Sequence, residues 1–263
     1  MKHELRLFLL ALQFLTRVPI PAWVGFRDDW MHASARHYPA VGLVVGAFGA
    51  AVLWAAAQLL PGSLAVLLSM AATVWLTGAF HEDGFADSCD GLGGAVSRDR
   101  ALEIMKDSRL GTYGTAGLVF MLGLKAAALM GLAELSLARA CILTVCTHGV
   151  SRAVPVALLR MLSYAGDPAH AKAKPMAQQV GNGGLMVALL WCVATAAAGM
   201  ALGVLSGTLI CALVAAAVLP TWLWACLLRR RLGGYTGDTL GAAQQLAELS
   251  MLLATLALIT RHP

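Results

Sequence analysis

Apolar residues fill long uninterrupted stretches of this chain, and polar residues gather in the short segments between them. Because a lipid interior offers the backbone no hydrogen-bond partners, apolar stretches that cross a bilayer must be helical. The pattern therefore predicts an all-α fold, a polytopic integral membrane bundle of about seven transmembrane helices. The predicted spans are 41–60, 62–80, 113–133, 138–159, 184–203, 207–228 and 241–260.

The N-terminal residues predict one further helix. Their apolar run resembles a signal peptide up to Arg17, but Arg-Val-Pro follows where a small-x-small cleavage site would stand. We therefore expect a retained helix, membrane-embedded or interfacial, that Pro19 and Pro21 end. No polar linker and no internal repeat divides the chain, so residues 1–263 are predicted to form a single membrane-embedded domain.

Composition and charge agree with a membrane protein. The chain is 59% hydrophobic and only 13% charged, and its mean hydropathy is +0.73. Of its 19 lysines and arginines, 15 fall in four segments that share one side if the seven spans are correct, and the positive-inside rule makes that side cytoplasmic. The formal charge of +5 thus reflects topology and lipid contact, and we expect no nucleic-acid partner. The four segments are 1–40, 81–112, 160–183 and 229–240.

Acidic residues are concentrated directly after the second predicted span. Of the 14 aspartates and glutamates, seven lie between residues 82 and 107. On a helix, Asp83, Asp87 and Asp90 fall at i, i+4 and i+7 and share one face, with Glu82 about 100° away. Carboxylates placed in this way repel one another, and each would cost about 2.5–3.5 kcal/mol at membrane depth. The pattern predicts a bound cation.

Three interpretations of the acidic segment remain open. It could be a solvated loop, although small and apolar residues are interspersed in it, or a proton or cation relay of a transporter. A divalent metal fits best, because an all-oxygen site without histidine or cysteine clusters suits Mg²⁺, with Mn²⁺ as the second choice. On this interpretation the metal ligands and catalytic residues are Glu82, Asp83, Asp87 and Asp90.

Glycines and cations follow the acidic residues. Gly91, Gly93 and Gly94 permit close backbone approach, and basic side chains come next along the chain. A metal, glycines and cations together are typical of a phosphate site. Taken singly, the glycines could simply end a helix and the cations could simply fix topology. The basic residues are Arg98, Arg100, Lys106 and Arg109.

Two basic residues lie well inside predicted spans, Arg152 and Lys125. Intramembrane charges usually face the bundle interior, so Arg152 is predicted either to bind a phosphate or an amide of the substrate or to form a structural ion pair. For His148, four residues earlier, packing or hydrogen bonding is the favoured interpretation. Lys125 has no evident partner in the sequence, and we expect it to snorkel along its helix.

Polar residues also open the last span. Asp238 either caps that helix or contacts substrate or metal. Gln244 and Glu248 share a helix face, and they either line a polar cavity or form hydrogen bonds between helices.

The central segments "HEDGFADSCDGLGG" and "RALEIMKDSRLGTYG" resemble the signature of the cobalamin synthase family, the adenosylcobinamide-GDP ribazoletransferases. Three further segments agree in order, so that the resemblance covers nearly the whole chain: "FLTRVPIP" (14–21), "SRAVP" (151–155) and "GGYTGDTLGAAQQLAE" (233–248). The resemblance implies transfer of the cobinamide phosphate of adenosylcobinamide-GDP to α-ribazole or its 5′-phosphate, with release of GMP.

The resemblance also implies an Mg²⁺-dependent enzyme of the bacterial cytoplasmic membrane, with its active site facing the cytoplasm. Candidate partners beyond the substrates are a second copy of the chain and other enzymes of cobalamin assembly. Membrane CDP-alcohol phosphotransferases, which also hold metals with an Asp-Gly-rich run, are a looser resemblance and the alternative function. Substrate contacts are predicted at Lys106, Asp107, Arg109, Arg98, Arg152 and Asp238.

The predicted topology can be tested with reporter fusions at residues 95 and 263. Seven spans that begin in the cytoplasm end in the periplasm. We therefore expect a cytoplasm-only reporter to be active at 95 and a periplasm-only reporter to be active at 263. Activity of the periplasm-only reporter at 95 would contradict the positive-inside assignment.

Overall fold

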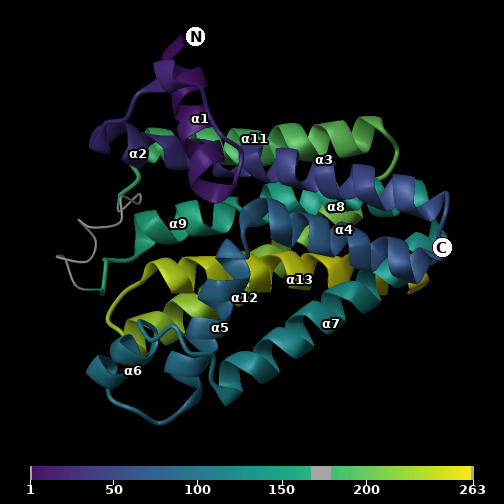
Figure 1. The fold of residues 1–263 in the computed structure, drawn as a ribbon. Coiled ribbons are helices and arrows are strands. Elements are labelled where there is room, and N and C mark those ends of the chain that lie inside the picture. Colours follow the sequence, from purple (N-terminus) through teal and green to yellow (C-terminus); the bar gives the residue numbers. More distant parts are fainter. Residues whose placement is uncertain (1, 167–178, 262–263) are drawn as a thin grey trace.

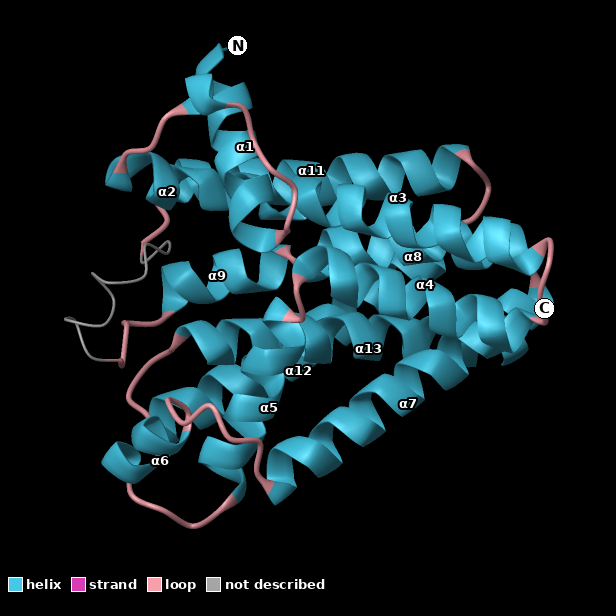
Figure 2. Ribbon diagram, viewed as in Figure 1, coloured by secondary structure: helices cyan, strands magenta, loops and turns pink. Residues whose placement is uncertain are grey.

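The computed structural model describes residues 2–166 and 179–261. Within these ranges the protein is a bundle of helices without strands (Figures 1 and 2), which confirms the predicted all-α membrane fold. The α-helices are α1 (Lys2–Leu15), α2 (Asp28–Ser34), α3 (Tyr38–Ala57), α4 (Gly62–Thr77), α5 (Phe80–Gly93), α6 (Arg98–Ile104), α7 (Thr112–Leu135), α8 (Leu137–Ser151), α9 (Ala153–Met161), α11 (Asn182–Ala201), α12 (Gly207–Arg231) and α13 (Gly237–Arg261).

Six helical segments of the described chain are long and apolar enough to cross a membrane. They include α3, α7, α11, α12 and α13, and α8 with α9 forms the sixth. A seventh crossing arises if α4 and α5 count as one span, although the two helices meet at an angle of 88°. The predicted spans are therefore all present as helices, but the second ends at Thr77 and turns sharply.

The turn between α4 and α5 separates the apolar pattern from the acidic one. Gly78 and Ala79 both have positive φ, 68° and 59°, and this left-handed backbone ends α4. Arg17 lies against the turn: its backbone N–H donates to the carbonyl of Leu76 at 2.8 Å. A Cβ added to Gly78 would lie only 2.8 Å from Nε of Arg17. The segment after α1 thus fixes the direction in which α5 leaves the bundle.

The helix ends fall into two groups in Figure 1. The connections α3–α4, α7–α8 and α11–α12 lie at the same end as the C-terminus. Helices α1, α2 and α6 and the connection α12–α13 lie toward the other end. The described parts of the four basic segments therefore gather at one end of the bundle, as the charge pattern predicts.

Helix α1 ends at Leu15, four residues before Pro19. One face of it is buried against the bundle through Leu7, Leu10 and Leu15. After it, Trp23 and Phe26 are exposed at 52% and 51%. Tryptophan is enriched at membrane–water interfaces, so these side chains are compatible with an interfacial segment. Its placement in or on a membrane stays a prediction.

Helices α3 and α8 cross with their backbones in close contact. A Cβ added to Gly42 would collide with the carbonyl oxygen of His148, and one added to Gly46 would lie 2.7 Å from the Cα of Val145. Small residues four apart allow helix backbones to approach in membranes.

We expect Gly42→Ala to destabilise the protein by about 1–3 kcal/mol, because the methyl group would push two backbones apart. The matched control is Gly123→Ala in α7, where an added Cβ has no neighbour within 4 Å. Thermal unfolding in detergent measures both variants. A Gly42→Ala protein that melts at or above the wild-type temperature would contradict the close contact between the α3 and α8 backbones at Gly42.

Candidate active site

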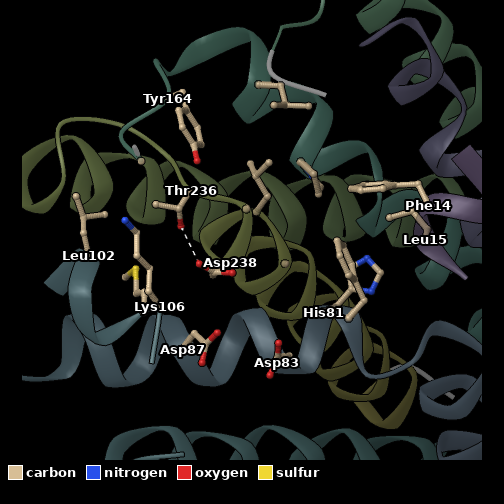
Figure 3. Close-up of a pocket in the computed structure, with 18 of the residues that line it drawn as sticks. Phe14, Leu15, His81, Asp83, Asp87, Leu102, Lys106, Tyr164, Thr236 and Asp238 are labelled. Atoms are coloured by element: carbon tan, nitrogen blue, oxygen red, sulfur yellow. Dashed lines mark hydrogen bonds between the residues drawn. The ribbon is translucent and has the colours of Figure 1, made fainter. Parts of the chain in front are cut away.

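A cavity of about 610 Å³ opens between α5, α9 and α13. Several of its lining residues come from the basic segments 81–112, 160–183 and 229–240, which places it toward the end of the bundle where those segments meet. Figure 3 shows the cavity with eighteen of its lining side chains. The polar residues on its wall are His81, Asp83, Asp87, Lys106, Asp107, Ser108, Arg152, Thr236 and Asp238.

Three aspartates occupy the middle of the cavity wall. Asp83 and Asp87, one turn apart on α5, lie on the same side of it, and Asp238 of α13 lies between them and the opposite wall (Figure 3). The predicted shared face of α5 is thus confirmed for these two residues. Neither the Asp83 nor the Asp87 side chain forms a hydrogen bond or ion pair within the described residues, whereas Asp238 accepts one from the Thr236 hydroxyl at 3.5 Å.

A close helix crossing brings these carboxylates together. A Cβ on Gly84 would lie 2.7 Å from the carbonyl oxygen of Asp238, and one on Gly241 would lie 3.3 Å from the Cα of His81. Glycine at both positions lets α5 and α13 touch through their backbones. Two carboxylates of α5 and one of α13 consequently face the same space, where their mutual repulsion favours a cation.

Asp90 lies one turn beyond Asp87 and outside the cavity lining. Its two carboxylate oxygens accept hydrogen bonds of 2.8 Å from the backbone N–H groups of Gly111 and Gly114, at the start of α7. A carboxylate at the N-terminus of a helix satisfies donors that have no partner within the helix. The structure therefore gives Asp90 a definite role in joining α5 to α7.

Glu82 points away from the cavity toward a buried polar network. Its Oε1 accepts a hydrogen bond from Gln245 at 2.9 Å, and its Oε2 is buried without a partner among the described residues. No group of three or more histidines, cysteines, aspartates or glutamates in the described chain is close enough to hold a metal. The four predicted ligands thus do not form one cluster.

Of the four basic residues that follow the acidic segment, Lys106 lines the cavity and the three arginines do not. Lys106 lines the cavity, and its side chain has no ion pair with any described residue. Arg109 is 87% exposed and donates hydrogen bonds of 2.5–3.1 Å to both carboxylate oxygens of Asp107. These bonds lower the pKa of Asp107 to about 2. Arg100 forms an exposed ion pair with Glu103 at 2.7 Å.

Arg98 holds two backbone segments together. It donates hydrogen bonds to the carbonyls of Leu232 at 2.8 Å and Ala165 at 2.9 Å, and it does not line the cavity. Its guanidinium is therefore already engaged where a substrate contact was predicted.

The glycines after the acidic residues pack against side chains. A Cβ on Gly91 would lie 2.6 Å from the side chain of Met105, and one on Gly93 would lie 2.6 Å from the ring of Tyr113. Neither glycine lines the cavity. The interpretation of these two glycines as a phosphate cradle is not supported, since their small size lets α6 and α7 pack against α5.

Arg152 reaches the cavity wall from a buried position. It is only 2% exposed, it donates to the carbonyl of His148 at 2.9 Å, and it contacts the His148 ring at 3.1 Å. Its Nε is buried without a partner among the described residues. An unsatisfied buried donor on a cavity wall suits an anionic or carbonyl group of a ligand.

Lys125 does not snorkel to the membrane surface, and that expectation was wrong. It is 5% exposed, its ammonium group lies 2.5 Å from Glu248, and it donates to Gln245 at 3.0 Å. The stem of a buried lysine cannot reach water when its helix face points into the bundle. Glu248 supplies the compensating charge instead.

The side chain of Gln244 donates to Glu248 at 2.6 Å and to Ser151 of α8 at 2.8 Å. Neither Gln244 nor Glu248 lines the cavity. Of the two interpretations of this helix face, hydrogen bonding between helices is therefore the one that the structure supports.

Several residues that line the cavity were not predicted as site residues from the sequence. Thr236 caps α13, because its hydroxyl accepts a hydrogen bond from the backbone of Thr239 at 3.3 Å. Asp238, which was one candidate for the cap, is left facing the cavity. The Thr-x-x-Thr pattern could have revealed this cap. No sequence signal identified Tyr38 or Tyr164, and Phe14 was marked only as the first residue of the segment 14–21; all three reach the cavity from distant parts of the chain.

Comparisons with known proteins agree with one another. Residues 7–256 match the family model described as cobalamin-5-phosphate synthase. An adenosylcobinamide-GDP ribazoletransferase of Leptothrix cholodnii is 63% identical over 257 residues, which cover 97% of this chain and 96% of the relative. A Vibrio cholerae protein with the same name is 41% identical and covers 98% of this chain and 96% of its own length. No solved structure matches.

We expect Asp90→Asn to loosen the start of α7, because one amide oxygen cannot replace two charged acceptors. The loss should be about 1.5–3 kcal/mol. Hydrogen exchange of the peptide around residues 108–116, in protein free of divalent metal, measures it. Asp28→Asn, at an exposed aspartate, is the charge-matched control. Unchanged exchange in Asp90→Asn would show that the carboxylate does not hold the helix.

Proposed function

The chain belongs to the cobalamin-5-phosphate synthase family, and from this premise we propose that it transfers the cobinamide phosphate of adenosylcobinamide-GDP to α-ribazole. The acceptor is α-ribazole or its 5′-phosphate, and GMP is released. This is the late nucleotide-loop assembly step of cobalamin biosynthesis. The observation that carries the proposal is a cavity that sets the unpaired carboxylates of Asp83 and Asp87 near Lys106.

The reaction exchanges one phosphorus–oxygen bond for another. A ribose hydroxyl oxygen of the acceptor bonds to the phosphorus on the cobinamide arm, and the bond from that phosphorus to the bridging oxygen of the diphosphate breaks. The hydroxyl proton passes to water, and GMP takes the bridging oxygen with its electron pair. Catalysis of such a transfer consists mainly of positioning and charge stabilisation.

Mg²⁺, or in its place Mn²⁺, is the proposed cofactor. Mg²⁺ is usually held by one or two carboxylates together with waters and substrate phosphates, so the absence of a three-ligand cluster in the described chain is compatible with it. Asp83 and Asp87 fit as its holders because both face the cavity without a protein partner, and Asp238 lies across from them. When bound, the metal supplies charge neutralisation at the diphosphate.

Side chains around the aspartates have separate proposed roles. Lys106, the lysine on the cavity wall, binds phosphate oxygens of the donor. Arg152 offers its unsatisfied Nε to a phosphate or amide of the substrate. Contacts of Arg98, Asp107 and Arg109 with substrate stay predictions, because Arg98 already binds two backbone carbonyls and the other two residues bind each other.

We place the enzyme in the bacterial cytoplasmic membrane with the cavity open toward the cytoplasm. The support is the gathering of described basic segments at the end of the bundle from which the cavity is lined. The nucleotide substrates are polar, so an opening on that side gives them access. Association with another copy of the chain or with other cobalamin-assembly enzymes stays a prediction.

The proposal predicts GMP release that requires both α-ribazole and a divalent metal. Protein in liposomes is given adenosylcobinamide-GDP with α-ribazole, and in parallel a CDP-activated lipid with an alcohol, each with and without Mg²⁺. The double variant Asp83→Asn/Asp87→Asn should lose about 100-fold or more in rate, equivalent to about 3 kcal/mol of barrier. The Asp28→Asn control should keep wild-type activity.

One outcome would overturn this function, and a second would overturn only the assignment of Asp83 and Asp87. Release of CMP alone would favour the phosphotransferase alternative. Full activity of the double variant, at a melting temperature equal to the wild type, would remove Asp83 and Asp87 from the chemistry.

A further inference from the structure

Four aromatic rings meet at one end of the cavity. Phe14 of α1 stacks on Tyr38 at the start of α3, with ring centroids 6.0 Å apart and planes 18° apart. The Phe14 ring meets Phe80 edge-on at 5.3 Å, and Phe80 meets His81 in the same way at 5.4 Å. All four residues line the cavity, although they come from three separate helices. We call Phe14, Tyr38 and Phe80 the aromatic group.

The aromatic group lies opposite the cationic end. In Figure 3, Phe14 and His81 stand on one side of the cavity and Lys106 on the other, with Asp83 and Asp87 between them. The remaining lining residues near the aromatic group include Leu15. The cavity thus has an aromatic end with the buried Arg152 near His81, an acidic middle and a cationic end at Lys106.

The substrates of the proposed reaction offer two flat bases for such an end, guanine and the dimethylbenzimidazole of α-ribazole. Guanine carries a ring N–H, an exocyclic amine and a carbonyl, and burial of each without a partner costs about 1–3 kcal/mol. The dimethylbenzimidazole has two methyl groups and no exocyclic donor. Both bases can stack on aromatic rings. An end made chiefly of carbon favours the benzimidazole, because it leaves fewer polar groups without partners.

Resting on the proposed function, we propose that the aromatic group is the subsite for the benzimidazole base of α-ribazole. With the base at Phe14 and Phe80, the ribose extends toward the acidic middle, so its hydroxyl comes next to Asp83 and Asp87. The donor's diphosphate then lies between the aspartates and Lys106. A cavity of about 610 Å³ holds a nucleoside with phosphates, and the much larger corrin ring stays at its mouth.

The test measures, for each variant, the KM for α-ribazole and the KM for adenosylcobinamide-GDP. Phe14→Leu and Phe80→Leu keep apolar volume but remove the ring, and each should raise the KM for α-ribazole about tenfold, as expected from the loss of one stacked aromatic ring. The KM for adenosylcobinamide-GDP should change by less than about twofold, within the spread expected for an untouched site. Phe80→Tyr keeps a ring and should restore the wild-type KM.

Phe120→Leu is the matched control, because Phe120 is 70% exposed on α7 and does not line the cavity. Direct binding of α-ribazole to donor-free protein, followed by the fluorescence of its base, gives a second measurement that needs no turnover. It should weaken in the two leucine variants and stay unchanged in Phe120→Leu.

The outcomes distinguish this subsite from the proposed function. A folded wild-type protein without ribazole-dependent GMP release would reject the function itself. An active wild type whose leucine variants bind adenosylcobinamide-GDP less tightly, with α-ribazole unaffected, would place guanine or corrin at the aromatic group. Equal loss for both substrates, with no rescue by Phe80→Tyr, would also overturn the subsite.

Discussion

The contact of α5 with α13 is the constraint on which the candidate site depends. Glycines at 84 and 241 let the two helix backbones touch, and the contact sets Asp83 and Asp87 opposite Asp238. A side chain at either glycine would separate the helices and widen the space between the carboxylates. The acidic residues are thus held near one another by backbone packing, although their charges repel.

A buried polar network stabilises the same contact from the other side. Glu248 of α13 pairs with Lys125 of α7, and Gln245 links Lys125 to Glu82 of α5. Charges in the middle of a helical bundle are costly unless they are paired and hydrogen-bonded, so each helix is restricted to the register that satisfies its partners. The network explains why Glu82 faces inward while Asp83, its neighbour, faces the cavity.

Arginine side chains also join helices at the end of the bundle where the basic segments meet. Arg231, at the end of α12, donates to the carbonyls of Leu92 at 3.3 Å and Gly94 at 2.8 Å, while Arg98 returns the contact to Leu232. Carbonyls at a helix C-terminus lack partners within the helix, and cations satisfy them. The charge pattern explains Arg98 and Arg231 by topology alone, but Arg231 also joins α12 to α5, and Arg98 joins α6 to the end of α12. Lys106 is the basic residue of this region that faces the cavity.

The sequence by itself determined the helical spans, the common end of the basic segments, and the shared face of Asp83 and Asp87. These features follow from local periodicity and from the length that a bilayer imposes, so neighbouring residues are enough to specify them. The tertiary structure decided the rest. It turned Asp90 toward α7, buried Lys125 beside Glu248, engaged Arg98 with backbone carbonyls, and brought Phe14 and Tyr38 to the cavity. Such contacts join residues far apart in the chain, and they depend on how helices cross, which no local pattern encodes.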